Sequence, residues 1–182
     1  RRRIYIGTGE NLSHPATGTS DAIIALEMDS GAMAWRFQAT ADDVWNAACL
    51  NGGANCPANA GGDFDFGASV IIAEREDGSE LLLAGQKSGE VFALDPDPDL
   101  VDGNGNGKVL WRNRISMGTT NGGIHWGMAL SGQRLVVPVA DPERERDGYI
   151  PKPGLYVLDV ASGELLWQQP VTRGCVIAPE NR

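Results

Sequence analysis

The chain has 182 residues, with 24 acidic and 15 basic side chains and a formal net charge of −9. This acidic balance argues against nucleic acid or an anionic membrane surface as the main partner, because both require clustered lysine and arginine. Hydrophobic residues make up 42% of the chain, which is too many for a disordered protein, and no apolar run approaches the about 20 residues of a membrane-spanning helix.

After three arginines the sequence enters a strand-like run, Ile4-Tyr5-Ile6, and it has no initiator methionine. Glycine accounts for 24 residues, and short β-branched runs occur where an amphipathic helix would show a 3.6-residue period. These features predict an all-β fold of short strands and tight turns. The missing methionine predicts a processed or truncated piece of a longer protein.

One pattern of eleven residues occurs twice, and a third time with an insertion. Residues 25–35 and 157–167 each contain a small or apolar residue, an acid two positions later, a Ser-Gly pair and a tryptophan four residues after the glycine. Residues 93–111 have the same beginning and end. The acid ends one strand, the glycine permits the turn, and a second strand leads to the tryptophan. Each copy therefore predicts a β-hairpin.

A further strand precedes each hairpin; these strands are Ile4-Tyr5-Ile6, Leu81-Leu82-Leu83 and Leu135-Val136-Val137. Such a unit is typical of a β-propeller blade, with a β-sandwich and chance tryptophan spacing as the alternative. At about 40–50 residues a blade, the chain holds about three blades. Because a closed ring needs at least about four, residues 1–182 are expected to be part of a single propeller domain whose N- and C-terminal blades are missing.

Cys49 and Cys56 lie in a loop rich in glycine and asparagine, between residues 46 and 62. Their spacing fits neither a zinc site nor haem attachment. A disulfide is expected, with two reduced cysteines as the alternative. A disulfide indicates an oxidising compartment such as the bacterial periplasm.

The tryptophan repeat resembles the docking motif of the eight-bladed quinoprotein propellers, which are alcohol dehydrogenases that use pyrroloquinoline quinone (PQQ). Residues 7–11 resemble the turn in which this family binds Ca²⁺, and residues 85–95 resemble the segment that gives the quinone a lysine or arginine. Residues 122–128 resemble a quinone-facing turn. The loops are most similar to the polyvinyl-alcohol dehydrogenase subgroup, notably at residues 11–15 and 63–69.

The resemblance implies a calcium site at Glu10 and Asn11. Glu10 stands where the family has a calcium-binding asparagine, which is a departure from the pattern, although a carboxylate is also a good ligand for Ca²⁺. Asn11 is the ligand if the turn is displaced by one residue. A polar β-turn without a metal is the alternative.

The family uses a carboxylate to take the hydroxyl proton of the alcohol while hydride passes to the quinone. Asp65 is the expected base, because it lies between Phe64 and Phe66 just before an apolar strand, and the two rings are expected to raise its pKa by desolvation. Asp43 is the second candidate for the base. The alternative for Asp65 is a structural role in which it caps backbone amides.

The resemblance also implies three cofactor-binding residues. Lys87 is expected to contact the quinone oxygens, where a cation stabilises the reduced ring; a solvated surface lysine is the alternative. Trp126 breaks the spacing of the docking tryptophans and is expected to line the quinone. His125 replaces the family's usual asparagine and can still donate a hydrogen bond.

The function implied by the resemblance is PQQ- and calcium-dependent oxidation of secondary alcohols, with polyvinyl alcohol as a candidate substrate and cytochrome c as the electron acceptor. A non-catalytic propeller that assembles other proteins is the alternative. The enzyme hypothesis predicts that four candidate residues converge at one end of the blades, whereas the scaffold hypothesis predicts that they are scattered. These residues are Glu10, Asp65, Lys87 and Trp126.

Overall fold

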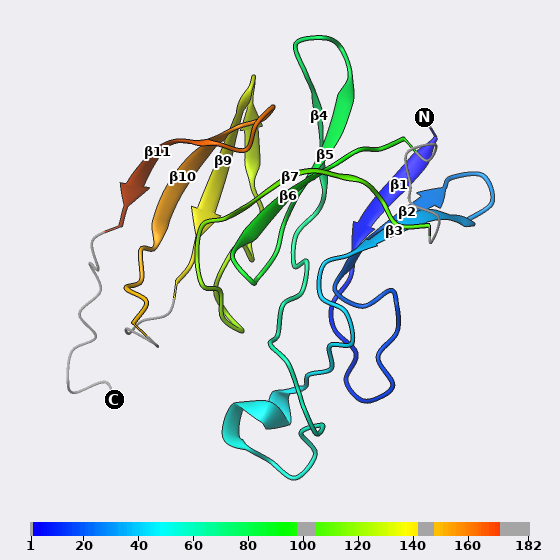
Figure 1. Cartoon of the computed structure of the whole chain (residues 1–182), viewed down its shortest axis with the longest axis vertical. Helices are drawn as coiled ribbons and strands as arrows, with labels where there is room; N and C mark the ends of the chain where they lie inside the picture. The colour runs from blue at the N-terminus through cyan, green and yellow to red at the C-terminus, as the bar shows by residue number, and fades with distance from the viewer. Residues whose placement is uncertain (1, 98–104, 142–147, 172–182) are drawn as a thin grey trace.

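The computed structural model of the chain describes residues 2–97, 105–141 and 148–171 (Figure 1). These residues form antiparallel strands in three sheets, which confirms the all-β prediction. In Figure 1 the sheets fan out side by side, with a loop that carries one short 3₁₀ helix below them. No helix in this described part of the chain is long and apolar enough to cross a membrane.

The three sheets follow one another along the chain. The first contains β1 (Arg3–Gly7), β2 (Ala22–Glu27) and β3 (Met33–Gln38). The second contains β4 (Ile71–Glu74), β5 (Glu80–Gly85), β6 (Glu90–Leu94) and β7 (Val109–Arg114). The third contains β8 (Ala129–Ser131), β9 (Arg134–Val139), β10 (Gly154–Asp159) and β11 (Leu165–Pro170). Neighbouring strands in each sheet are also neighbours in sequence, so each sheet is a meander.

The three hairpins predicted from the repeat are confirmed, and they share one register. The tryptophan of each hairpin pairs with the residue two positions before the repeat's acid, and the pairing shifts by one residue immediately afterwards. The pairs are Ala25 with Trp35, Ala93 with Trp111, and Val157 with Trp167. A bulge at the same place in all three sheets twists the strand and sets the direction of the tryptophan.

The tryptophans of the first two sheets each dock against the following sheet. The indole of Trp111 donates a hydrogen bond of 2.9 Å to the carbonyl oxygen of Val160 and covers Gly163, where any side chain would collide with its ring. Trp35, only 1% exposed, lies in the same way against Gly107. The repeat motif therefore joins neighbouring sheets as well as closing its own hairpin.

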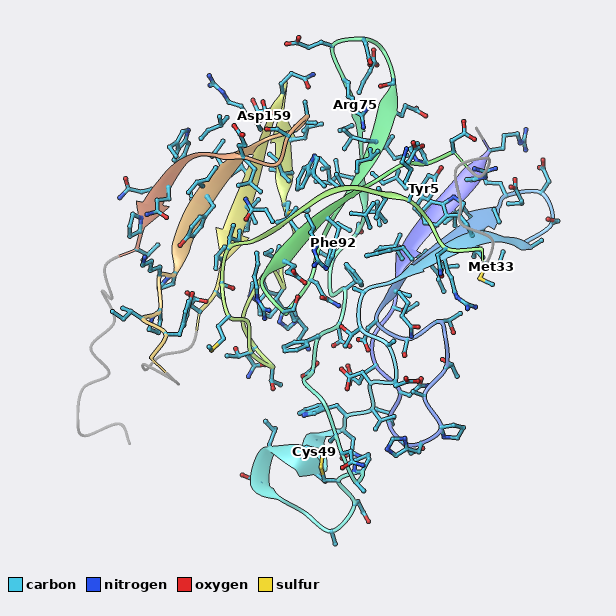
Figure 2. The ribbon with its side chains drawn as sticks, in the orientation of Figure 1. Tyr5, Met33, Cys49, Arg75, Phe92 and Asp159 are labelled. Carbon is cyan, nitrogen blue, oxygen red and sulfur yellow. A yellow bond between two sulfur atoms is a disulfide. The ribbon has the colours of Figure 1, made fainter. Side chains whose placement is uncertain are left out.

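Two apolar cores lie between the sheets, one on each face of the second sheet. On β5, Leu82 packs toward the first sheet, while Leu81 and Leu83 pack toward the third. Phe92 of β6 belongs to the core shared with the first sheet, where Figure 2 labels it. Because side chains alternate along a strand, a strand buried on both faces needs an unbroken apolar run, and this accounts for the three consecutive leucines.

The disulfide prediction is confirmed: Cys49 and Cys56 are bonded, with their Cα atoms 4.8 Å apart, at the bottom of Figure 2. Two details were not predicted. The segment Ala47–Asn51 forms a 3₁₀ helix (η1), whose first turn is capped by the side chain of Asn46. The short strand β8 was also missed, because its three residues are all exposed and give no alternating pattern.

Candidate active site

The loops at one end of the first two sheets come together. Gly7, the last residue of β1, pairs with Ile23 near the start of β2, and Ile71, the first residue of β4, pairs with Leu83 near the end of β5. The loop after β1, the segment before β4 and the turn after β5 are therefore at the same end. These are the segments that carry Glu10, Asp65 and Lys87.

Lys87 is the centre of an ion-pair network. Its ammonium group donates a hydrogen bond of 2.7 Å to Asp65 Oδ2 and another to Asp63 Oδ1. The side chains of Lys87 and Asp63 are almost fully buried, whereas that of Asp65 is 29% exposed. An ammonium has three donors, so Lys87 keeps one N–H beyond these two bonds.

Main-chain hydrogen bonds hold the three segments in place. The N–H of Lys87 donates to the carbonyl oxygen of Asp65 at 3.0 Å, and the N–H of Phe66 donates to that of Thr8 at 3.1 Å. The N–H of Glu10 donates to Asp65 Oδ1 at 3.2 Å. The carboxylate of Asp65 is therefore fixed by partners from both sheets.

The Gly-Thr-Gly turn after β1 is shaped for this close approach. A Cβ atom at Gly7 would lie 2.6 Å from Phe66 Cβ, and a Cβ atom at Gly9 would collide with the carboxylate of Asp65. Real Cβ atoms essentially never come so close. The two glycines are thus required by the packing of the aspartate segment against the turn.

A second group of carboxylates adjoins the ion-pair network. One oxygen each of Glu10, Asp21 and Asp65 lie within 4.8 Å of one another. Asp21 is completely buried, and neither of its carboxylate oxygens, nor Glu10 Oε2, has a hydrogen-bond partner among the described residues. Oxygen ligands with this spacing suit a hard cation such as Ca²⁺.

The pKa of Asp65 differs from the one expected from the sequence. Burial by itself would raise the pKa of Asp65, but hydrogen bonds with Glu10 and Lys87 hold it well below its usual range. The prediction that the flanking phenylalanines raise this pKa is therefore wrong. Phe66 is packed into the core against Phe92, with ring centroids 5.8 Å apart. The effect of desolvation on the pKa of Asp65 is outweighed by its hydrogen bonds with Glu10, Lys87 and Asp63 taken together.

The raised pKa values belong to other acids. Burial, followed by the hydrogen bond with Asp65, raises the pKa of Glu10 to about 8. Burial, followed by the charge of Asp43, raises the pKa of Asp21 to about 7. Burial alone would lower the pKa of Lys87, but its two aspartate partners raise it, so the ammonium stays protonated.

Asn11 lies outside the carboxylate group. Its side-chain oxygen accepts hydrogen bonds from the N–H and the hydroxyl of Thr17, at 2.7 and 3.1 Å, and its carbonyl oxygen accepts the N–H of Trp45 at 2.9 Å. Asn11 therefore organises its own loop, and Asp21 stands in the carboxylate group where the sequence had suggested Asn11.

Trp126 and His125 lie in the turn before β8, next to the other segments. The N–H of Ile124 donates to the carbonyl oxygen of Gln86 at 3.1 Å, and the ring of His125 contacts Gly67. The two rings are stacked, with centroids 4.2 Å apart. Trp126 is 76% exposed, unlike a docking tryptophan, and His125 Nδ1 has no partner among the described residues.

Asp43, the second candidate for the base, is buried beside Gly61. Burial raises its pKa above the usual value. A cleft of about 350 Å³ reaches Asp63 instead, and it does not include Asp43. Its lining consists of Trp45, Arg114, residues 61–64 and residues 117–120. Among the acids of the site, Asp63 is the one that lines this cleft.

Sequence reasoning missed two residues of the site. Asp63 was available from its spacing, because residues two apart in an extended segment face the same side, and it contacts the same ammonium as Asp65. Asp21 was signalled by a charged residue directly before the apolar run of β2. Asp63 lies in segment 63–69, which carried part of the resemblance, whereas Asp21 lies outside all the segments that did.

Comparison with known proteins agrees with this architecture. A europium-containing methanol dehydrogenase superposes with a TM-score of 0.51 over 93% of this chain and 23% of that one, at 16% sequence identity. This likeness concerns the fold alone. The three sheets, each docked to the next by a repeated tryptophan, are blades of a β-propeller.

The sequence profile of the family described as outer membrane protein assembly factor BamB matches residues 87–182. Because this match covers more than half of the chain, the chain belongs to that family of propeller repeats. Curated relatives are enzymes. A polyvinylalcohol dehydrogenase of Sphingopyxis sp. (strain 113P3) is 37% identical over 171 residues, or 92% of this chain. A quinohemoprotein alcohol dehydrogenase, ADH IIB of Pseudomonas putida, is 26% identical over 129 residues, or 64% of this chain.

The chain is much shorter than these relatives. It spans 25% of the polyvinylalcohol dehydrogenase and 16% of the quinohemoprotein. The alignment with the former nevertheless covers 92% of this chain.

Proposed function

We propose that this chain is part of a quinoprotein alcohol dehydrogenase that uses PQQ and Ca²⁺, and that its residues form one side of the active site. The observation that carries the proposal is the convergence of Glu10, Asp65 and Lys87 from two blades, through hydrogen bonds of 3.2 and 2.7 Å. The enzyme hypothesis requires this convergence, whereas a scaffold has no use for a buried group of charges.

The side chains present fit both absent groups. Carboxylate oxygens of Glu10 and Asp21, which have no hydrogen-bond partner in the part of the chain that the structure describes, offer Ca²⁺ the hard ligands that it prefers. For the quinone, Lys87 has one N–H beyond its two hydrogen bonds to described residues, and Trp126 presents an exposed aromatic face. His125 Nδ1 is a second available polar atom beside that ring.

PQQ held by Lys87 and Trp126 would supply the acceptor for the two electrons and the carbon-bound hydrogen of the alcohol. Asp65 then serves as the general base that takes the hydroxyl proton. Its partial exposure of 29% leaves it accessible to a substrate. Lys87 keeps Asp65 ionised, and therefore able to accept a proton, because the ammonium favours the charged carboxylate.

The finer features of the function rest on the same resemblance. Secondary alcohols, including polyvinyl alcohol, are the proposed substrates, and cytochrome c is the proposed electron acceptor. The proposed location is the periplasm, because a disulfide such as Cys49–Cys56 persists in an oxidising compartment. We propose further that residues 1–182 belong to one propeller domain together with other blades. Cell fractionation tests the location directly.

Dye-linked alcohol oxidation tests the proposed reaction. The full-length product of the gene that encodes this chain is stripped with a chelator, then supplied with PQQ and Ca²⁺ and a secondary alcohol. We expect dye reduction that depends on the quinone, and a loss of about 10²–10⁴-fold in kcat in Asp65→Asn, which cannot accept the proton. Asp42→Asn, at a nearby exposed residue, is the control and should retain its activity.

Quinone-independent activity, or full activity in Asp65→Asn, would contradict the proposal. Full activity in Asp65→Asn together with a large loss in Asp43→Asn would instead assign the base to Asp43.

A protein-binding scaffold is the second candidate function, favoured by the family description that matches residues 87–182. That segment does not include Glu10, Asp21 or Asp65, so the scaffold leaves the carboxylate group unexplained.

A further inference from the structure

Asp21 is a buried acid that the fold itself holds in an unusual position. Its backbone φ of 47° lies in the left-handed region, which aspartate tolerates better than most residues. Its N–H donates to the carbonyl oxygen of Gly9 at 3.0 Å, and its carbonyl oxygen accepts the N–H of Ala39 at 2.9 Å. The main chain therefore fixes where the side chain points.

The side chain itself has no partner. Asp21 is 0% exposed, and neither carboxylate oxygen accepts a hydrogen bond from any described residue. A buried carboxylate without a partner is strongly unfavourable, and such groups call for a specific explanation. Among the described residues, therefore, no hydrogen bond stabilises the charge of Asp21.

The neighbouring groups make the deficit of positive charge larger. Glu10 and Asp65 each place an oxygen within 4.8 Å of one from Asp21, and Asp43 and Asp63 also act on it electrostatically. Lys87 is the one cation among the groups that act on Asp21, and its hydrogen bonds go to Asp63 and Asp65. Another positive charge would complete the group.

We propose that Asp21 is a direct ligand of a divalent cation, Ca²⁺, that it shares with Glu10 and Asp65. Two oxygens that bind one Ca²⁺ at about 2.3–2.6 Å can be at most about 5 Å apart, and the three carboxylates meet this limit. An all-oxygen set without histidine or cysteine disfavours zinc and other soft metals. The inference rests on the proposed function for the identity of the ion, but metal binding is measurable without quinone or substrate.

The alternative is that Asp21 is a neutral, protonated acid with a purely structural role. Asp21→Asn separates the two possibilities, because asparagine has nearly the same shape, tolerates a left-handed backbone and carries no charge. The matched control is Asp43→Asn, which removes a charge from another buried aspartate near the site that is outside the group of three.

The experiment is a Ca²⁺ titration of the chelator-treated full chain by calorimetry, with the calcium-induced rise in melting temperature as a second readout. We expect Asp21→Asn to weaken calcium binding at least tenfold and to abolish most of the thermal shift, and Asp43→Asn to change the affinity less than threefold. If Asp21→Asn does not fold, Asp21→Ser and Glu10→Gln, both expected to lose affinity, replace it.

Unchanged affinity in Asp21→Asn, an equal loss in the control, or no calcium binding by the wild-type chain would overturn the inference. Calcium binding that is normal in the wild type and lost in Asp21→Asn, together with no quinone-dependent activity, would refute the proposed function but retain the metal site. The two failures are therefore distinguishable.

Discussion

The contact between the first two blades has two regions with opposite character. Its body is apolar: Trp35, Leu82 and Phe92 are buried there with 1%, 0% and 2% of their surface exposed. Its end contains Glu10 and Asp21, whose buried oxygens have no partner among the described residues. The body accounts for the cohesion of the blades, whereas the end reduces their stability, and such uncompensated charge is typical of a functional site.

The largest expected effect is on the apolar body. Trp35→Ala should lower the free energy of unfolding by about 3–5 kcal/mol, because it removes a buried ring and leaves a cavity. Trp167→Ala is the matched control, since Trp167 has the same place in its repeat but is 49% exposed; its loss should be below about 1 kcal/mol. Urea unfolding of the full chain measures both, and equal losses would refute the docking role.

A smaller effect is expected where the body meets the charged end. Lys87→Met leaves the buried Asp63 and the partly exposed Asp65 without a cation, so the unfolding free energy at pH 7 should fall by about 3 kcal/mol. Lys108→Met changes an exposed lysine and should have little effect. If the two variants are equally stable, the ion pair has no part in holding the blades together.

The pH dependence of stability tests the charged end directly. The folded-state pKa values of Glu10 and Asp21 are about 8 and about 7, against ordinary values of 4.5 and 3.8. Between about pH 4 and pH 8 the folded chain therefore holds protons that the unfolded chain has released. Without metal, the unfolding free energy should fall as the pH rises through this range.

Calcium should counteract that fall above pH 7, because it binds the deprotonated carboxylates. Asp21→Asn should have a shallower pH dependence than the wild type. Urea unfolding at several pH values, with chelator and then with calcium, provides the measurement. A stability that rises from pH 4 to pH 8 in chelator would contradict the raised pKa values.

The smallest effect on stability is expected at the exposed aromatic face. Trp126→Ala should change the unfolding free energy by less than about 0.5 kcal/mol, because the side chain is 76% exposed. Binding of PQQ to the full-length protein, followed by fluorescence, should weaken several-fold. Stability loss comparable to that of Trp35→Ala would instead make Trp126 a docking tryptophan.

Much of the fold was predictable, because the repeat encodes local geometry. The Ser-Gly turns and the strands ending in Trp35 and Trp167 follow from turn chemistry and side-chain alternation, and the spacing identified Trp111 despite its insertion. The strand β8 was not predictable, since three exposed residues have no periodicity to detect.

The candidate site was predictable only where a motif marks it. Glu10, Asp65 and Lys87 were located from their loops, and the structure brings them together. The pKa of Asp65 was predicted in the wrong direction, because its sequence neighbours are aromatic but its hydrogen-bond partners in space are Glu10 and Lys87. Asp21 was missed for a similar reason. The other two members of the carboxylate group, Glu10 and Asp65, lie 11 and 44 positions away in sequence, and a local sequence pattern does not show that residues so far apart are close in space.

The hairpin between β5 and β6 is bonded on both sides. Lys87 donates its N–H to Asp65 on one flank, and Gln86 accepts that of Ile124 on the other. These two main-chain bonds fix the hairpin that carries the ammonium of Lys87 between the segment before β4 and the turn before β8. We therefore expect the blades to stay rigid during turnover. Access of the substrate is then controlled by the loops that border the cleft. The sequence of the disulfide-bonded loop of Cys49 and Cys56 can vary without displacing the side chains of the site.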